Sequence, residues 1–207
     1  MEKAIEIQSH WGTTIRNEYL VQGKDTLAVL LPGGRYTLMA PLMYYAYVAV
    51  QQAGYDILAV EYGFQRTDKG IQHNETDLAH LTSEAQEAIS KCLDQKDYKK
   101  LIFIGKCLGT HIQTQLADIF ADISQKHIFI TPWLECIETI NRADSLVIVG
   151  SNDAIFKKEH TDRIAVVDHI KLNIIDGANH DLEKGGYQES LAILTNVTEC
   201  IYNHILA

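Results

Sequence analysis

The chain has 207 residues, of which 46% are hydrophobic and 22% are charged; 18 lysines and arginines stand against 27 aspartates and glutamates, a net charge of −9. These proportions are ordinary for a soluble globular protein with one sizeable core. The acidic balance disfavours nucleic acid and anionic membranes as partners, because both select a basic surface.

No part of the sequence is typical of a membrane span or an export signal. The longest uncharged apolar stretch, 38–50, contains Pro41 and is shorter than the roughly 20 residues that a transmembrane helix needs. The first six residues lack the basic start and apolar core of a signal peptide. The four cysteines lie far apart without a C-x-x-C pair: Cys92, Cys107, Cys136 and Cys200. We therefore expect free thiols, a cytoplasmic location, and neither a metal nor another cofactor.

Two kinds of segment alternate along the chain. Short β-rich apolar runs predict strands, and longer segments with apolar residues every three or four positions predict helices. In chain order these are strands at 4–8, 14–21 and 26–31, a helix at 41–53, a strand at 56–60, a helix at 75–93, a strand at 101–104, a helix at 108–123, strands at 127–130, 146–149 and 169–175, and a helix at 189–206.

Strands that are apolar along most of their length and alternate with helices predict an α/β fold, with a mostly parallel sheet covered on both faces. The first two strands alternate more loosely and are expected to form an antiparallel pair at one edge. Connections are short and no linker or repeat is present. We expect residues 1–207 to form a single domain.

Polar residues follow several of these strands directly. One strand is followed by 32–35 (Pro-Gly-Gly-Arg), another by Cys107, and the last two by Asp153 and His180. Ligands bind at the carboxyl ends of the strands in open parallel sheets. We therefore expect a thiol, a carboxylate and an imidazole to meet at one edge of the sheet.

The thiol lies in an unusual turn, because residues 105–109 read G-K-C-L-G. The two glycines remove Cβ atoms that would clash in a sharp strand-to-helix turn, so Cys107 is expected at a strained, exposed tip. This turn, with nucleophile, acid and histidine in that order, resembles the α/β-hydrolase superfamily over nearly the whole chain. A cysteine at the tip is similar to the dienelactone hydrolase branch.

The resemblance implies a catalytic triad in which Cys107 attacks an acyl carbonyl, His180 transfers protons and Asp153 orients the imidazole. It also implies an oxyanion hole made by the N–H of Leu108 and by an N–H of the loop 32–35, from Gly34 or Arg35. The start of the following helix is expected to lower the pKa of the thiol. The expected partner is a small acyl substrate.

The chain departs from the dienelactone hydrolase pattern in one respect that bears on substrate. That branch typically carries an acidic residue just after the strand that here precedes Pro32, and this chain has none. The resemblance to the dienelactone hydrolase branch therefore implies a cysteine nucleophile but does not imply a dienelactone substrate. Only about a dozen residues separate Trp133 from the next strand, so little or no lid is expected over the cleft. Three basic residues could attract an anionic substrate at its mouth, although ordinary solvated surface charge is the favoured interpretation: Arg35, Arg66 and Lys106.

The leading interpretation is a cofactor-independent hydrolase of small carboxylic esters, lactones or thioesters. Two others stay open. A non-catalytic binding or redox-sensing protein could use the same fold with an oxidisable thiol, and an acyltransferase could use the same three residues. No G-x-G-x-x-G or phosphate-binding loop opens any predicted helix, and no histidine–carboxylate pair has metal-ligand spacing.

Overall fold

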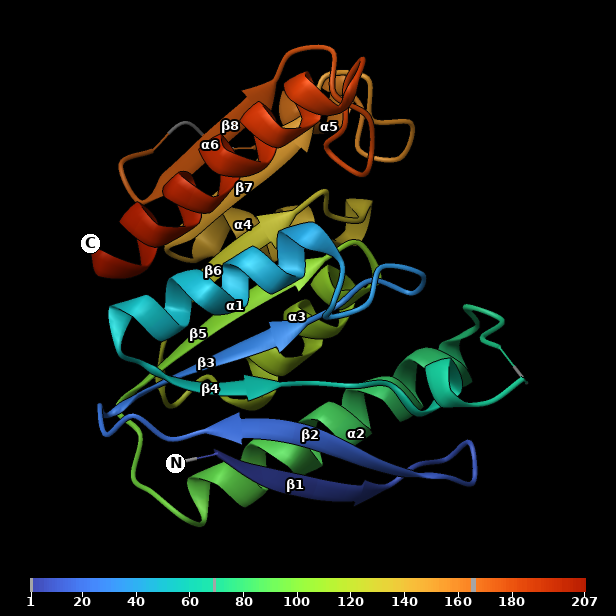
Figure 1. Cartoon of the computed structure of the whole chain (residues 1–207), viewed down its shortest axis with the longest axis vertical. Helices are drawn as coiled ribbons and strands as arrows, with labels where there is room; N and C mark the ends of the chain where they lie inside the picture. Colours follow the sequence, from blue (N-terminus) through green and yellow to red (C-terminus); the bar gives the residue numbers. More distant parts are fainter. Residues whose placement is uncertain (1, 69, 165–166) are drawn as a thin grey trace.

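Eight strands form one sheet in the computed structural model of the chain, which describes residues 2–68, 70–164 and 167–207 (Figure 1). The strands are β1 (Glu2–Gln8), β2 (Thr14–Leu20), β3 (Thr26–Leu31), β4 (Asp56–Ala59), β5 (Lys100–Lys106), β6 (Ser124–Ile130), β7 (Ser145–Gly150) and β8 (Ile170–Ile175). Their order across the sheet is β1-β2-β4-β3-β5-β6-β7-β8. Only the β1–β2 and β2–β4 pairings are antiparallel. The mostly parallel sheet and its antiparallel edge pair are therefore as the sequence predicts.

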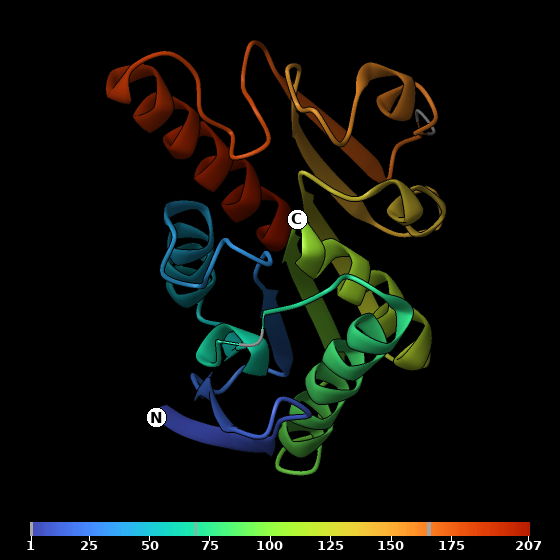
Figure 2. The same ribbon diagram turned by 90° about the vertical axis from the view of Figure 1, so that its right-hand side faces the viewer.

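Helices cover both faces of this sheet. The longer ones are α1 (Pro41–Ala53), α2 (Glu75–Leu93), α3 (Leu108–Ile119) and α6 (Tyr187–Leu206), and the short ones are η1 (Gly63–Arg66), η2 (Leu134–Cys136), α4 (Ile137–Arg142) and α5 (Lys158–Thr161). Figures 1 and 2 show α1 and α6 on one face and α2 and α3 on the other. Each pair packs on its own apolar cluster. Strand β3 is buried along its whole length, as a central parallel strand covered on both faces must be.

The helix predicted at 108–123 is shorter in the structure, and the strand that follows is longer. Helix α3 ends at Ile119 and β6 begins at Ser124, three residues before the predicted start. The start of β6 is polar, so hydrophobic pattern does not reveal it. Lys126 is buried in this part of the strand, and its ammonium donates to the backbone carbonyl of His204. Pairing with the start of β5, rather than hydrophobic pattern, defines the first half of β6.

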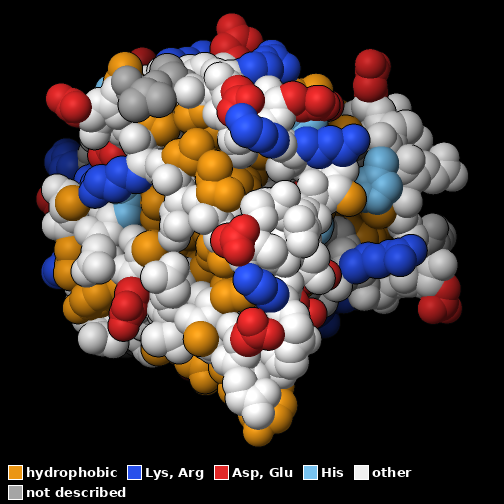
Figure 3. Space-filling model, turned by 90° about the horizontal axis from the view of Figure 1, so that it is seen from above, with side chains coloured by type: hydrophobic (Ala, Val, Ile, Leu, Met, Phe, Trp, Pro, Cys, Tyr) orange, Lys and Arg blue, Asp and Glu red, His pale blue; other side chains and the backbone are white. Residues whose placement is uncertain are grey.

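Strand β8 forms one edge of the sheet, and none of its residues is buried. Leu172 and Ile174 on β8, and Val167 before it, are exposed. Figure 3 views the molecule from this side and shows hydrophobic side chains at the surface among charged ones. Within the described ranges, no helix is both long and apolar enough to cross a bilayer.

Candidate active site

The site is built around a strained turn between β5 and α3. Cys107 has φ 50° and ψ −114°, a left-handed φ that a side chain rarely adopts. The flanking glycines make the turn possible: a Cβ on Gly109 would lie 1.9 Å from the carbonyl oxygen of Leu31, and one on Gly105 would lie 2.4 Å from Oε1 of Gln113. The turn therefore places the thiol at the carboxyl ends of the strands; its backbone is strained, as the G-K-C-L-G pattern predicts, but Cys107 is only partly exposed.

Asp153 and His180 meet beside this turn. Nδ1 of His180 lies 3.0 and 2.9 Å from the two carboxylate oxygens of Asp153. The carboxylate is itself held, because its Oδ1 accepts hydrogen bonds from the backbone N–H groups of Ile155 and Phe156 at 2.7 and 3.1 Å. Its side chain is fully buried. The pKa of Asp153 is lowered, since these hydrogen bonds and that of His180 outweigh its burial. An ionised carboxylate therefore orients the imidazole.

The other ring nitrogen faces the thiol. Nε2 of His180 is buried and makes no hydrogen bond of good geometry, yet it lies close enough to interact with Cys107. Catalytic hydrogen bonds are often loose before substrate binds. Burial would raise the pKa of the Cys107 thiol, but His180, then the Lys106 ammonium and the Trp133 indole, lower it. The Asp153 and Cys107 partners outweigh burial at His180 and raise its pKa to about 9. Both shifts act in the direction of a thiolate–imidazolium pair.

Two backbone segments can stabilise negative charge next to the thiol. The N–H of Leu108 is the first of α3 and has no partner within the helix. On the other side, Gln65 donates from Nε2 to the carbonyl oxygens of Gly33 and Gly34 at 3.0 and 3.2 Å. In a trans peptide bond the carbonyl of one residue and the N–H of the following residue point in opposite directions. The hydrogen bonds from Gln65 to these two carbonyls therefore direct the N–H groups of Gly34 and Arg35 away from Gln65. Within the described chain neither group has a hydrogen-bond partner, whereas the Gly33 N–H donates to the Tyr36 carbonyl.

Thiol and imidazole line a cavity of about 660 Å³. Much of its lining is apolar, with side chains from Phe64, Ile71, Leu108, Trp133 and Ile155. The connection from β6 to β7 adds no covering layer, since it holds only η2 and α4. The β1–β2 turn contacts a residue of the cavity lining: Nε1 of Trp11, in that turn, donates to the carbonyl of Gly70.

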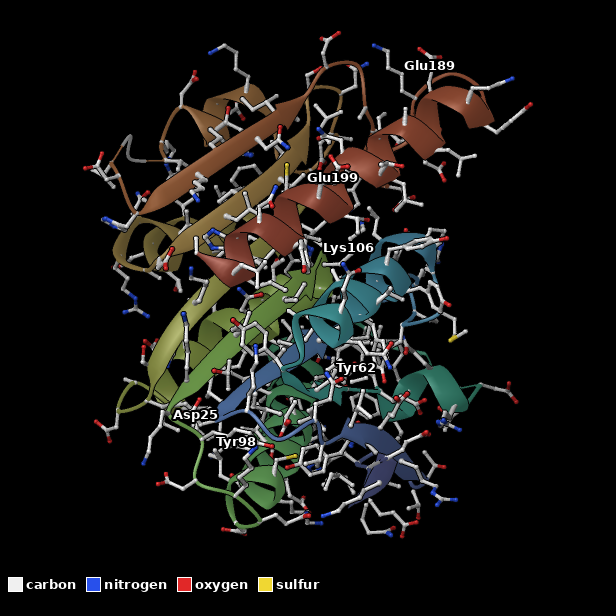
Figure 4. All side chains as sticks on the ribbon, turned by 60° about the vertical axis from the view of Figure 1, so that its left-hand side comes forward. Asp25, Tyr62, Tyr98, Lys106, Glu189 and Glu199 are labelled. Carbon is white, nitrogen blue, oxygen red and sulfur yellow. The ribbon has the colours of Figure 1, made fainter. Side chains whose placement is uncertain are left out.

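The three basic residues predicted at the mouth of the cleft have different surroundings. Arg35 is exposed and lines the cavity. Arg66 does not: it lines a separate hollow and pairs with Glu61, because η1 turns its side chain away. Lys106 lines the cavity but is only 1% exposed, so it is no surface cation. Lys106 is the last residue of β5 and lies at the opposite end of the strands from Asp25 and Tyr98 (Figure 4).

Sequence reasoning missed two residues at the site. Trp133 lies beside the thiol, three residues after β6 ends at Ile130. Asp153 is selected because it closely follows a strand, and the same reasoning applies to Trp133. Gln65 lies in η1, and no motif marks it. Thr110 is fully buried, and its hydroxyl donates to the Cys107 carbonyl and accepts from the Trp133 N–H. It therefore ties the nucleophile turn to the loop that carries Trp133.

The donor groups of the site do not form a metal centre. Across residues 2–68, 70–164 and 167–207, no cluster of three or more His, Cys, Asp and Glu side chains has the geometry to hold an ion. The chemistry that the arrangement can perform is nucleophilic attack and proton transfer.

Comparison with known proteins identifies the fold. No family profile and no curated sequence matches the chain. A protein of unknown function from Agrobacterium tumefaciens, described as an α/β-hydrolase, superimposes with a TM-score of 0.74 at 16% identity, over 98% of this chain and 96% of that one. A lidless serine hydrolase from Xanthomonas campestris gives 0.71 at 13%, over 99% and 93%. A dienelactone hydrolase from Anabaena variabilis gives 0.71 at 17%, over 100% and 97%. The chain thus has the α/β-hydrolase fold in one domain.

Proposed function

We propose that the protein is a cofactor-independent hydrolase of small carboxylic esters, lactones or thioesters, acting through a covalent S-acyl intermediate on Cys107. One observation carries the proposal. A cysteine in a strained strand-to-helix turn lies on a cavity beside an imidazole whose Nδ1 is 2.9 Å from a buried carboxylate. Nucleophile, base and orienting acid in this relation are the elements of acyl transfer by a triad.

Acylation follows from the charge state of the pair. The Cys107 thiolate attacks the acyl carbonyl carbon, and the carbonyl π electrons move to oxygen. The N–H of Leu108, with that of Gly34 or Arg35, donates to this oxyanion. When the tetrahedral intermediate collapses, the bond to the leaving oxygen or sulfur breaks, and His180 gives that atom the proton on Nε2. Asp153 stays ionised and stabilises the imidazolium.

Deacylation reverses these roles. Neutral His180 removes a proton from water, and the resulting hydroxide attacks the thioester carbonyl. The same N–H groups stabilise the second oxyanion. The sulfur leaves as thiolate, the carboxylic acid departs, and the thiolate–imidazolium pair is restored. The apolar lining, with Trp133 and Phe64, suits a short or flexible acyl chain, and a cavity of this size holds a small molecule rather than a polymer.

The test is a panel of short-chain p-nitrophenyl esters, lactones and acyl thioesters, followed by intact-mass measurement of the protein during turnover. We expect hydrolysis together with one added acyl group, located on Cys107 by peptide mapping. Cys107→Ala should abolish both. Cys200→Ala is the matched control, because Cys200 is partly exposed on α6 and contacts Asn173, away from the cavity. Full turnover by Cys107→Ala would refute the proposal.

A redox-sensing role is the second candidate, and the lowered pKa of the Cys107 thiol favours it, since thiolates are the form that peroxide oxidises. It predicts no turnover on the panel and a sulfenic acid on Cys107 that thiols reduce. Acyl transfer to another acceptor would use the same residues. It is distinguished by adding small alcohols and amines to the assay and measuring acylated acceptor against free acid.

A further inference from the structure

The residue before the nucleophile is a buried lysine whose contacts the triad leaves unexplained. We propose that Lys106 is a positioning residue, which fastens the histidine loop (residues 176–183) to the nucleophile turn (residues 105–109) and stabilises Cys107 as a thiolate. The proposal rests on the proposed function only in taking Cys107 as the reacting group.

All three hydrogens of the ammonium have acceptors. Nζ of Lys106 donates to Oγ1 of Thr131 at 3.0 Å, to the backbone carbonyl of His180 at 2.9 Å and to Oδ1 of Asp181 at 3.2 Å. It also lies 4.9 Å from the centre of the Tyr36 ring. A cation that is 1% exposed and fully hydrogen-bonded has no free donor for a substrate. Its role is therefore within the protein.

These contacts join three strand ends. Lys106 is the last residue of β5, Thr131 follows β6, and the histidine loop follows β8, two strands beyond β6. A long side chain is needed to reach from β5 past β6 to that loop. The bond to the His180 carbonyl acts on the backbone of the catalytic residue itself, while Asp153 holds its ring. The position of the imidazole relative to the thiol is thus fixed both at the backbone of His180 and at its ring.

The same ammonium contributes charge to the site. The ionisable groups that interact with it are Cys107, Asp181, Asp153 and His180, with the Tyr36 ring against it. Burial lowers the pKa of Lys106, and the thiolate and Asp181 oppose this shift. In return the ammonium lowers the pKa of the Cys107 thiol. The Asp181 carboxylate, whose side chain is 53% exposed, partly offsets this positive charge.

A merely structural buried ion pair would give another result. Removing a merely structural ion pair would change the unfolding free energy, but it would leave the pKa of the Cys107 thiol unchanged in the folded variant. The positioning role predicts opposite shifts of the thiol pKa when either member of the pair is neutralised. Removal of the ammonium should raise this pKa, and removal of the carboxylate should lower it.

The experiment measures thiolate absorbance near 240 nm and the rate of iodoacetamide reaction as functions of pH, with Cys107→Ala subtracted as background. Lys106→Met keeps the length of the side chain without its charge. We expect the thiol pKa to rise by about one unit, so that alkylation slows about tenfold at a pH below both the parent and the variant pKa. Asp181→Asn should move the pKa downward. Where ester turnover is present, Lys106→Met should lower kcat more than it raises KM.

Lys184→Met is the matched control. Its ammonium also binds the histidine loop, through the Asp176 carbonyl at 3.1 Å, but lies at the surface. It should leave the thiol titration unchanged. An unshifted thiol in folded Lys106→Met refutes the proposal. If that variant fails to fold by near-UV circular dichroism, Asp181→Asn decides: a downward shift supports the proposal, and none or an upward one refutes it. None of these titrations needs turnover, so a failure of the hydrolase proposal is separately visible in Cys107→Ala.

Discussion

At Cys107 the reactivity of one side chain depends on groups from three parts of the chain. His180, Lys106 and Trp133 outweigh the burial of the thiol, and the start of α3 adds its N–H groups. The residue types of the triad are readable in the sequence because each follows a strand. Lys106 is different: Asp181, its ion-pair partner, is 75 positions away, and nothing local shows that its side chain points inward.

The ionisation of this pair predicts the pH dependence of kcat/KM for ester hydrolysis. The rate should rise with pH as the thiol of Cys107 loses its proton, below the ordinary thiol value because its pKa is lowered. It should fall again through about pH 9, where His180 loses the proton that the leaving group needs. Asp153→Asn removes the main cause of the raised pKa, so the alkaline limb should move to lower pH. A rate that keeps rising well above pH 9 would contradict this assignment.

Gln65 provides the second prediction for a single residue. Gln65→Leu has nearly the same size but no donors, so it releases the carbonyls of Gly33 and Gly34. Removing an oxyanion donor outright costs about 10²–10³ in kcat. A loosened loop should cost less, about tenfold, with little change in KM. Arg66→Gln, whose parent side chain pairs with Glu61 outside the cavity, should leave kcat unchanged. Equal losses in both variants would place the effect in η1 as a whole.

At the scale of elements, close approach of backbone segments shapes the site. The start of α3 lies against the end of β3, and the end of β7 lies against the histidine loop: a Cβ on Gly150 would be 2.1 Å from the carbonyl oxygen of Ala178. Hydrophobic pattern predicts the long helices and central strands because these are buried along repeating faces. It fails for α4 and α5, which are too short to show a period, and for the polar start of β6, which strand pairing determines.

The contact between α3 and β3 predicts the effect of Gly109→Ala. The new Cβ would meet the Leu31 carbonyl oxygen at 1.9 Å and the carbonyl of Pro32 at 2.7 Å, and neither is a flexible side chain. The helix must shift, at a cost of about 3 kcal/mol or more in unfolding free energy. Urea denaturation followed by circular dichroism measures this. Gly186→Ala is the control, since φ is −89° and the new Cβ would meet only the end of Gln188; its cost should stay below about 1 kcal/mol.

For the whole molecule, the two ends of the sheet have separate roles. The proposed catalytic groups lie at the carboxyl ends of the parallel strands, and a polar network lies at the amino ends. There the carboxylate of Asp56 accepts from the N–H groups of Gln22 and Gly23, the ammonium of Lys96 and the hydroxyl of Tyr98. This network joins the β2–β3 turn, the start of β4 and the α2–β5 connection. It holds the sheet together far from the chemistry.

Asp56→Asn should therefore lower stability without changing catalysis. The Asp56 side chain is fully buried, and loss of its charge leaves Lys96 without a counter-ion, so the unfolding free energy should fall by about 3 kcal/mol. Its hydrogen bonds outweigh burial and lower its pKa below the ordinary 3.8. The contribution of Asp56 to the unfolding free energy is thus fully present above that value and is lost as pH falls through its native pKa. The unfolding free energies of the parent and of Asp56→Asn should therefore converge in strong acid. Asp97→Asn, at an exposed pair with Lys99, should change stability by less than about 1 kcal/mol. An altered kcat in folded Asp56→Asn would show that the two ends of the sheet are coupled.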